Sequence, residues 1–213
     1  AARPFRTHHN TLDMDLYLRI APELYLKRLI VGGMDRVYEI NRNFRNEGIS
    51  TQHNPEFTML EFYQAFTDYK GMIDLSKELL AQTAIDATGS PVVERDGCKL
   101  DFSNIRTLTM REAVIEFWRG ADKPSLDNLK DPEWLGLHSG KMSPGERLAD
   151  IFERVAEEHL FDPTIIYEYP VETSPLSKNN DEDPAFVDRF EVYAGGMELG
   201  NAYTELNDPR VQE

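Results

Sequence analysis

The sequence predicts an α+β fold in which helices flank an antiparallel β-sheet. Segments with apolar residues at alternate positions are joined by polar loops, as in antiparallel hairpins. Segments with apolar residues three and four positions apart lie between other strand-like segments, which indicates helices packed on the sheet. Hydrophobic residues make up 40% and charged residues 29% of the 213 residues, as in soluble globular proteins.

The first part of the chain predicts a helix followed by a long hairpin. A short strand is expected at residues 17–20. A helix is expected over residues 23–31, because Pro22 suits a helix start and apolar residues recur at helical spacing. Residues 36–44 alternate in strand period, and so do the aromatic-rich residues 56–66. The polar residues between these two strands are expected to form the loop of the hairpin.

The rest of the chain predicts alternating helices and strands. Helices are expected over residues 69–87, 109–118 and 144–160. Strands are expected over residues 99–102 and 164–169, and two more within residues 186–206, around Gly195 and Gly196. Thr109 and Glu112 have the spacing of a capping box. Residues 120–145 are polar with scattered Pro and Gly, and we expect an insertion there.

The charge balance of the chain limits the kinds of partner that it suits. Lys and Arg total 23 against 38 Asp and Glu, a formal net charge of -15 that matches nucleic-acid phosphates poorly. The acidic surplus suits a cationic substrate or a metal ion, although it also serves solubility alone. The single cysteine, Cys98, excludes an internal disulfide, and no apolar run is long enough to cross a bilayer. We therefore expect a protein of the reducing cytoplasm with no membrane partner.

The loop of the first hairpin carries side chains that suit a nucleoside triphosphate. The planar guanidinium of Arg45 can hold a phosphate or a carboxylate through two hydrogen bonds. His53 can donate to the same anion, and the ring of Phe57 offers a face on which a base stacks. The alternative is a solvated loop with a surface ion pair, which is the more common role of such residues.

The strand after this loop carries Phe57, Glu61 and Tyr63 on one face, because side chains alternate along a strand. A carboxylate and a phenol beside an aromatic ring are unusual for a face that only forms core. The face can be a pocket wall that receives a cationic group. Alternatively, Glu61 lies on an edge strand and pairs with a neighbouring Lys or Arg.

The last two strands carry a third group of candidate residues. Glu191 and Glu198 come from adjacent strands and can share a Mg²⁺ ion, which prefers carboxylate oxygens and phosphates. Asn201, Tyr203 and Glu205 share one strand face. Glu198 has the wrong parity for that face unless a β-bulge intervenes, for which Gly200 is a suitable place. The alternative is a solvated acidic strand.

Several of these segments together resemble one family. Residues 42–48 (RNFRNEG) and 53–61 (HNPEFTMLE) resemble motif 2 of class II aminoacyl-tRNA synthetases, in the form found in lysyl-tRNA synthetases. Residues 2–10, 174–178 and 201–209 resemble the same family. The aspartyl and asparaginyl families share parts of motif 2 but lack the Glu-Leu-Asn-Asp ending of the last segment.

The resemblance implies a role for each candidate residue. It implies an ATP site made of Arg45, Glu47, His53, Asn54 and Phe57. It implies a lysine site made of Glu23, Glu61, Tyr63, Asn201, Tyr203 and Glu205. It implies a Mg²⁺ site made of Glu191 and Glu198. Arg45 is the expected catalytic residue, because it would hold the ATP α-phosphate and stabilise the charge that develops there.

The resemblance also implies an activity and its partners. The expected reaction activates L-lysine with ATP to lysyl-adenylate and transfers the lysyl group to tRNA(Lys). Residues 1–213 are expected to form part of one class II catalytic domain, without motifs 1 and 3 and without the anticodon-binding barrel. We expect a homodimer in a longer protein that grips tRNA largely outside this chain. Two alternatives stay open: a related enzyme that ligates lysine to a translation factor, and an inactive lysine-binding paralogue.

Overall fold

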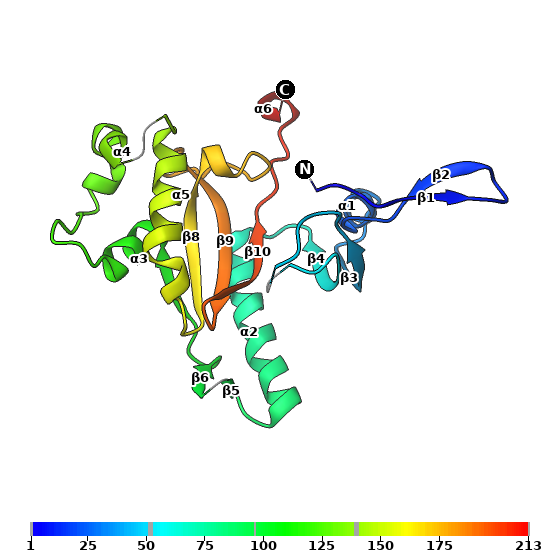
Figure 1. Ribbon diagram of the computed structural model, residues 1–213, viewed down its shortest axis with the longest axis horizontal. Coiled ribbons are helices and arrows are strands. Elements are labelled where there is room, and N and C mark those ends of the chain that lie inside the picture. Colours follow the sequence, from blue (N-terminus) through cyan, green and yellow to red (C-terminus); the bar gives the residue numbers. More distant parts are fainter. Residues whose placement is uncertain (1, 51–52, 96, 139–140, 213) are drawn as a thin grey trace. The chain divides into compact units, whose positions relative to one another are not determined.

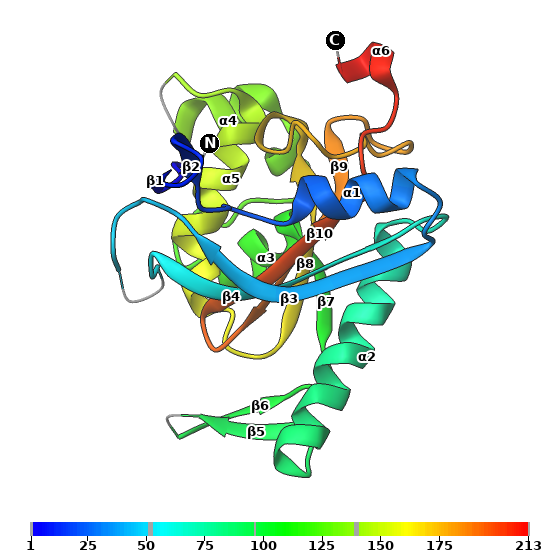
Figure 2. The same ribbon diagram turned by 90° about the vertical axis from the view of Figure 1, so that its right-hand side faces the viewer.

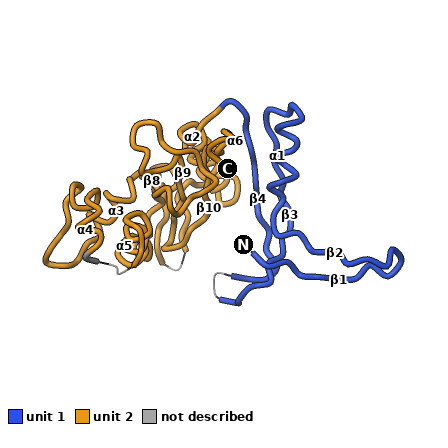
Figure 3. The backbone as a smooth tube through the Cα atoms, turned by 90° about the horizontal axis from the view of Figure 1, so that it is seen from above, with its two compact units in different colours: residues 1–66 blue, residues 67–213 orange. Residues whose placement is uncertain are grey.

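The chain divides into two compact units, residues 1–66 and residues 67–213 (Figure 3). The structure is a computed structural model, and it describes residues 2–50, 53–95, 97–138 and 141–212. Within these ranges, no helix combines the length and the apolar character that crossing a membrane requires. Both units mix helices with antiparallel strands, which confirms the predicted α+β class.

The first unit contains two hairpins and one helix. Its elements are β1 (Arg6–His9), β2 (Met14–Tyr17), α1 (Glu23–Val31), β3 (Arg36–Phe44) and β4 (Glu56–Gln64). Strands β3 and β4 run antiparallel over their whole length, from the pair Arg36 and Gln64 to the pair Phe44 and Glu56 (Figure 2). Helix α1 packs against this hairpin and buries Leu26 on it. The predicted helix and long hairpin are therefore confirmed.

The strand predicted at residues 17–20 is wrong. Strand β2 ends at Tyr17, because its partner β1 is short and the ladder between them runs only from Arg6 and Tyr17 to His9 and Met14. The amide of Leu18 still donates to the carbonyl of Phe5, at 2.9 Å, before the chain leaves the pair. Both strands are exposed along their length, so alternation of apolar residues could not mark them.

The second unit is built on a four-stranded sheet in the order β10–β9–β8–β7. These strands are β7 (Arg106–Thr109), β8 (Thr164–Pro170), β9 (Phe186–Ala194) and β10 (Met197–Tyr203). Figure 1 labels β8, β9 and β10 in this sheet. The β8–β9 and β9–β10 pairs are antiparallel, as predicted. Strand β7, which the sequence did not predict, adds a parallel edge to β8. A parallel pair needs a long crossover, and the segment between β7 and β8 supplies it.

Helices and a small hairpin complete the second unit. They are α2 (Tyr69–Thr88), β5 (Val92–Arg95), β6 (Cys98–Asp101), α3 (Met110–Phe117), α5 (Pro144–Val155), the 3₁₀ helices η2 (Glu157–His159) and η3 (Val171–Thr173), and α6 (Pro209–Gln212). The strand expected at residues 99–102 is β6, one residue earlier. The predicted capping box of Thr109 and Glu112 begins α3. The helix expected over residues 144–160 ends at Val155 and continues as η2.

Residues 120–145 contain more structure than their polar composition indicates. They form the 3₁₀ helix η1 (Asn128–Lys130) and the helix α4 (Pro132–His138). Leu129 and Leu135 from this segment are 1% and 3% exposed. The segment is therefore anchored in the core of the second unit, and its status as an insertion stays a prediction.

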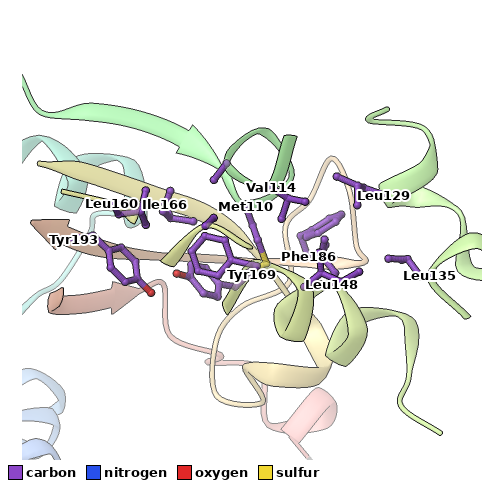
Figure 4. Packing of buried hydrophobic residues seen from close by; sticks show 14 of the residues in the cluster. Met110, Val114, Leu129, Leu135, Leu148, Leu160, Ile166, Tyr169, Phe186 and Tyr193 are labelled. Atoms are coloured by element: carbon purple, nitrogen blue, oxygen red, sulfur yellow. The ribbon is translucent and has the colours of Figure 1, made fainter. Parts of the chain in front are cut away.

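One hydrophobic cluster holds the second unit together (Figure 4). It joins α3, α5 and the segment around α4 to strands β8 and β9. Its members are Met110, Ala113, Val114, Leu129, Leu135, Leu148, Ile151, Phe152, Ala156, Leu160, Ile166, Tyr169, Phe186, Val187 and Tyr193. Because β9 is buried along nearly its whole length, the polar residues on it must be paired within the protein.

The hairpin of β9 and β10 sets the register of the last strand. Gly195 and Gly196 form a two-residue turn in which both have positive φ, at 65° and 71°. Such a turn matches the twist of an antiparallel hairpin, and glycine adopts it without strain. The register then shifts between Glu198 and Gly200, which leaves Leu199 as the extra residue of a β-bulge. The bulge predicted near Gly200 is confirmed.

Candidate active site

Arg45 lies at the point where the β3–β4 ladder ends. Its amide donates to the carbonyl of Pro55 at 2.9 Å, which extends the hairpin by one bond beyond the pair of Phe44 and Glu56. Its guanidinium carbon lies 5.1 Å from the centre of the Phe57 ring. The structure therefore brings two of the predicted ATP-binding residues together, with a cation over the face of an aromatic ring.

The other predicted ATP residues lie on the loop. The Ser50 hydroxyl lies 2.8 Å from Nδ1 of His53, and the backbone of these residues is joined in both directions. Asn54 donates from Nδ2 to the carbonyl of Glu56 at 2.7 Å. Glu47 is exposed. The loop thus carries the imidazole of His53 and the exposed carboxylate of Glu47. Two backbone hydrogen bonds between Ser50 and His53 join the two sides of the loop.

The predicted lysine residues of the first unit lie on one face of the hairpin and at the start of α1. The Tyr63 hydroxyl donates to Oε2 of Glu61 at 3.0 Å. Burial raises the pKa of the Glu61 carboxyl; the Tyr63 bond opposes the rise, and the nearby Glu23 carboxylate adds to it. Glu23 itself pairs with Lys27 at 2.6 Å. A half-buried carboxylate whose charge is disfavoured is a suitable partner for an incoming cation.

Sequence reasoning missed a second acidic position on this face. Glu39 lies directly opposite Glu61 in the β3–β4 pair and binds Nη1 of Arg19 at 2.6 Å. Hydrogen bonds from Asn41 and Arg19 lower the pKa of Glu39. Asn41 and Arg19 thus favour the ionised form of Glu39 beside Glu61. The sequence showed that Val37, Glu39 and Asn41 share one strand face, but it did not show that Glu39 pairs with a residue 20 positions earlier.

In the second unit, the bulge at Leu199 brings Glu191, Glu198 and Asn201 to one face. Asn201 lies opposite Glu191 across the pair of β10 and β9, and Glu198 lies opposite Tyr193. The Asn201 amide donates to Oε1 of Glu198 at 3.0 Å. As predicted, the extra residue of the bulge places Glu198 on the same strand face as Asn201.

Glu191 is the most enclosed of the candidate acids, with 9% of its side chain exposed. Its Oε1 accepts from Nη2 of Arg189 and its Oε2 from the hydroxyl of Tyr193, both at 2.5 Å. Burial and the Glu191 carboxylate raise the pKa of Tyr193, so the phenol stays protonated and donates. Arg189 also donates to Ser174 at 2.9 Å. Sequence reasoning missed Arg189 and Tyr193, although each lies two positions from Glu191 in β9 and therefore on the same strand face.

Glu157 adds a further negative charge near this face. Burial raises the pKa of its carboxyl, and the carboxylates of Glu153, Glu191 and Glu198 raise it further. In the described ranges there is no group of three or more His, Cys, Asp or Glu side chains arranged to hold a metal ion. Glu191 and Glu198 suit a Mg²⁺ ion that takes its other ligands from phosphates and water, because each carboxylate keeps acceptor sites beyond its present bonds.

Tyr203 and Glu205 lie at the end of the last strand. Tyr203 pairs with Arg189 in the ladder, which places it on the face of Glu191 and Asn201. Glu205 forms a bridge with Ser177, and the amide of Leu206 donates to the carbonyl of Leu176 at 3.0 Å. The loop of residues 174–184 therefore fixes the backbone of Glu205. The two groups of candidate residues belong to different units.

The chain is similar to known proteins over its whole length. The family model of class II tRNA synthetases (D, K and N) matches residues 1–213. The chain is 53% identical to the lysine–tRNA ligase of Escherichia coli (strain K12), 52% identical to that of Shigella dysenteriae serotype 1 and 51% identical to that of Salmonella arizonae. Each alignment covers 100% of this chain and 43% of the relative, so the chain spans less than half the length of these relatives. The chain therefore belongs to the class II tRNA synthetase family of the D, K and N type.

Proposed function

We propose that the chain supplies most of the active site of an enzyme that activates L-lysine with ATP and transfers the lysyl group to tRNA(Lys). The observation that carries the proposal is the set of acids on two site faces, Glu61 beside Tyr63 and Glu191 beside Asn201, in a chain 53% identical to a lysine–tRNA ligase. A buried ammonium group needs carboxylates to offset the loss of its hydration.

The first unit supports the nucleotide part of the proposal. Arg45 would hold the α-phosphate of ATP and the carboxylate of lysine, and adenine would stack on Phe57. His53 would face the terminal phosphates, while Glu47 and Asn54 would contact the nucleotide. The pair of Arg45 and Phe57, 5.1 Å apart, supports this assignment because it joins a phosphate-binding group to a stacking face.

The acids divide between lysine and metal in this proposal. Glu61, Tyr63 and Glu205 would bind the ε-ammonium group, and Tyr203 would line the same site. Glu23 and Asn201 would place the backbone of lysine. Glu191 and Glu198 would hold Mg²⁺, which when bound neutralises charge on the triphosphate. Arg189 and Tyr193 would keep the Glu191 carboxylate in one orientation, since each of its oxygens already accepts a short hydrogen bond.

The proposed chemistry proceeds in two displacements. A carboxylate oxygen of lysine attacks the α-phosphorus, the bond to the bridging oxygen breaks, and pyrophosphate leaves with that electron pair. Arg45 would stabilise the charge that spreads over the α-phosphate oxygens. A hydroxyl of the terminal tRNA ribose then attacks the lysyl carbonyl and AMP leaves. Selectivity for lysine follows, because a neutral side chain could not offset the cost of removing the Glu61 and Glu205 carboxylates from water.

The partners and location belong to the same proposal. We propose that the longer protein is a cytoplasmic homodimer and that much of its grip on tRNA lies outside residues 1–213. The net charge of -15 supports this division, because phosphate contacts depend on Lys and Arg.

The test is amino-acid-dependent exchange of pyrophosphate into ATP, run with each standard amino acid. The proposal expects exchange with lysine only, and expects Arg45→Ala to lower it at least about 100-fold. Arg42→Ala is the matched control, because Arg42 is 69% exposed and pairs with Glu56 on the hairpin. Exchange with another amino acid, or none with any, would contradict the proposal for this chain. Transfer of radiolabelled lysine to tRNA rather than to a translation factor then separates the two enzyme classes.

A further inference from the structure

Two carboxylates face each other on the hairpin of β3 and β4, whose strands run side by side in Figure 2. Glu39 lies directly opposite Glu61 in the antiparallel ladder, so both side chains project from the same face of the hairpin. The Cβ atoms of such a pair are roughly 5 Å apart, and like charges at that separation destabilise the pairing of the strands. A positive charge on this face is therefore favourable, and which carboxylate it pairs with matters.

The nearest cation on this face pairs with Glu39. Nη1 of Arg19 lies 2.6 Å from Oε1 of Glu39, and the Asn41 amide donates to the same oxygen at 2.9 Å. Glu61 instead accepts from the neutral hydroxyl of Tyr63 at 3.0 Å. In the described part of the chain, Glu61 belongs to no ion pair of 4.0 Å or less. One carboxylate of the facing pair is thus neutralised, and the other keeps its charge open.

Arg19 is close enough to Glu61 to pair with it instead. Burial raises the pKa of the Glu61 carboxyl, and the positive charge of Arg19 is among the effects that oppose this rise. Nε of Arg19 donates to the carbonyl of Arg42 at 3.3 Å, which holds the side chain beside β3. Its Nη2 is buried and meets no acceptor among the described residues, so a second carboxylate would satisfy it. Glu39 and Glu61 therefore compete for one guanidinium.

We propose that Glu39 is a positioning residue that holds Arg19 away from Glu61 and so keeps Glu61 open to the ammonium group of the substrate. This inference rests on the proposed function, in which Glu61 binds the ε-ammonium group of lysine. With Arg19 held on Glu39, these three side chains carry one uncompensated negative charge, which matches the single charge of an ammonium group. If Arg19 paired with Glu61, lysine would have to displace a guanidinium before it could bind.

The test measures lysine binding by isothermal titration calorimetry, without ATP, in variants that change charge but keep side-chain shape. Glu39→Gln releases Arg19 toward Glu61 and is expected to weaken lysine binding about tenfold. Arg19→Gln removes the competing cation and is expected to bind lysine at least as tightly as the unchanged chain. The double variant Arg19→Gln/Glu39→Gln is expected to regain the affinity that Glu39→Gln loses.

This pattern separates the proposed role from a purely structural one. If the pair of Arg19 and Glu39 only stabilised the hairpin, both single variants would bind lysine more weakly and the double variant would not recover. Glu56→Gln is the matched control, because Glu56 pairs with Arg42 at 3.3 Å on the opposite face of the same hairpin and is expected to bind lysine like the unchanged chain.

Three results would overturn the inference while leaving the proposed function intact. They are unchanged lysine binding by Glu39→Gln, weaker binding by Arg19→Gln, and a double variant that binds no better than Glu39→Gln. The second result is read from a variant that keeps Glu39, so it does not depend on how Glu39→Gln folds. An unchanged chain that does not bind lysine would overturn the proposed function and this inference with it.

Discussion

Asn201 lies directly opposite Glu191 in the antiparallel pair of β10 and β9, and its amide also donates to Glu198. In a regular strand Glu198 and Asn201, three positions apart, would point to opposite faces. The extra residue Leu199 removes this conflict. The Asn201 side chain therefore lies on the same face as both carboxylates proposed for Mg²⁺. Arg189 and Tyr193 orient Glu191, the more buried of the two.

Removing the Glu191 carboxylate is expected to lower stability strongly. Glu191→Ala would leave Arg189, whose side chain is 22% exposed, with one charge partner fewer and the Tyr193 hydroxyl without its acceptor. The expected loss is about 3 kcal/mol of the free energy of unfolding, measured by urea denaturation. Glu116→Ala is the matched control. Its partner Arg106 lies 2.6 Å away in a pair that is 38% and 39% exposed, so the expected loss is below about 1 kcal/mol. Equal losses in the two variants would contradict the role given to Glu191.

Replacing Glu61 is expected to stabilise the chain without ligands while removing its activity. Because the folded-state pKa of Glu61 is raised, the protonated form favours folding, and that contribution disappears as the pH rises through the raised pKa. Glu61→Gln should therefore melt at a higher temperature than the unchanged chain at pH 7, with the difference vanishing toward pH 4. At the same pH 7, lysine-dependent exchange should be lost.

Glu146 provides a control of opposite sign for that titration. Its hydrogen bonds to Ser143 in the capping box of α5 lower the pKa of its carboxyl. A lowered pKa contributes stability above the unfolded-state value, and this is lost as the pH falls through the folded-state value. Glu146→Gln should therefore melt lower than the unchanged chain at pH 7 and approach it in acid. If Glu61→Gln and Glu146→Gln shift the melting temperature in the same direction at pH 7, the opposite pKa shifts given to these two carboxyls are wrong.

A methyl group at Gly145 is expected to disturb the start of α5. The Cβ atom of an alanine there would contact the Glu172 carboxylate and lie 2.7 Å from Cβ of Pro170. The Glu172 side chain can move, but the proline ring is fixed to β8, so Gly145→Ala is expected to lose about 1–3 kcal/mol in urea denaturation. Gly48→Ala is the control, because no atom lies within 4 Å of the added carbon. No difference between the two variants would show that the start of α5 adapts freely.

Replacing Glu205 is expected to reduce the preference for lysine. Glu205→Gln removes one of the proposed partners of the ε-ammonium group, so kcat/KM for lysine in the exchange assay should fall about 100-fold. This fall should come mainly from a higher KM for lysine, with ATP binding unchanged. Asp181→Asn is the control, since Asp181 is 82% exposed and pairs with Lys178 in the neighbouring loop. A Glu205→Gln variant with unchanged kcat/KM would remove Glu205 from the lysine site.

The sequence was most informative where local chemistry alone decides structure. Strand β3 has the predicted bounds, because its polar and apolar residues alternate from Arg36 to Phe44. The capping box of Thr109 marked the start of α3, and the glycines at 195 and 196 marked the turn before β10. The bulge at Leu199 could be predicted because the parity of two candidate residues required it.

Features that depend on distant partners could not be predicted. Strands β5 and β7 are four residues long, too short for a period, and β7 is fixed by parallel pairing with β8. Arg19 binds Glu39 from outside any strand, and Arg111 binds Glu168 across the crossover. The sequence does not indicate such ion pairs, because the partners are far apart along the chain and each alone resembles an ordinary surface charge.

The parallel edge of the sheet has a consequence for the order of folding. Strands β9 and β10 are joined by a two-residue turn, so their contacts form between neighbours in the chain. Strand β7 can pair with β8 only after α3, α4 and α5 have been brought back over the sheet, which closes a long loop before any bond rewards it. In refolding experiments the β9–β10 hairpin should gain protection from hydrogen exchange first. The β7 edge should gain protection last.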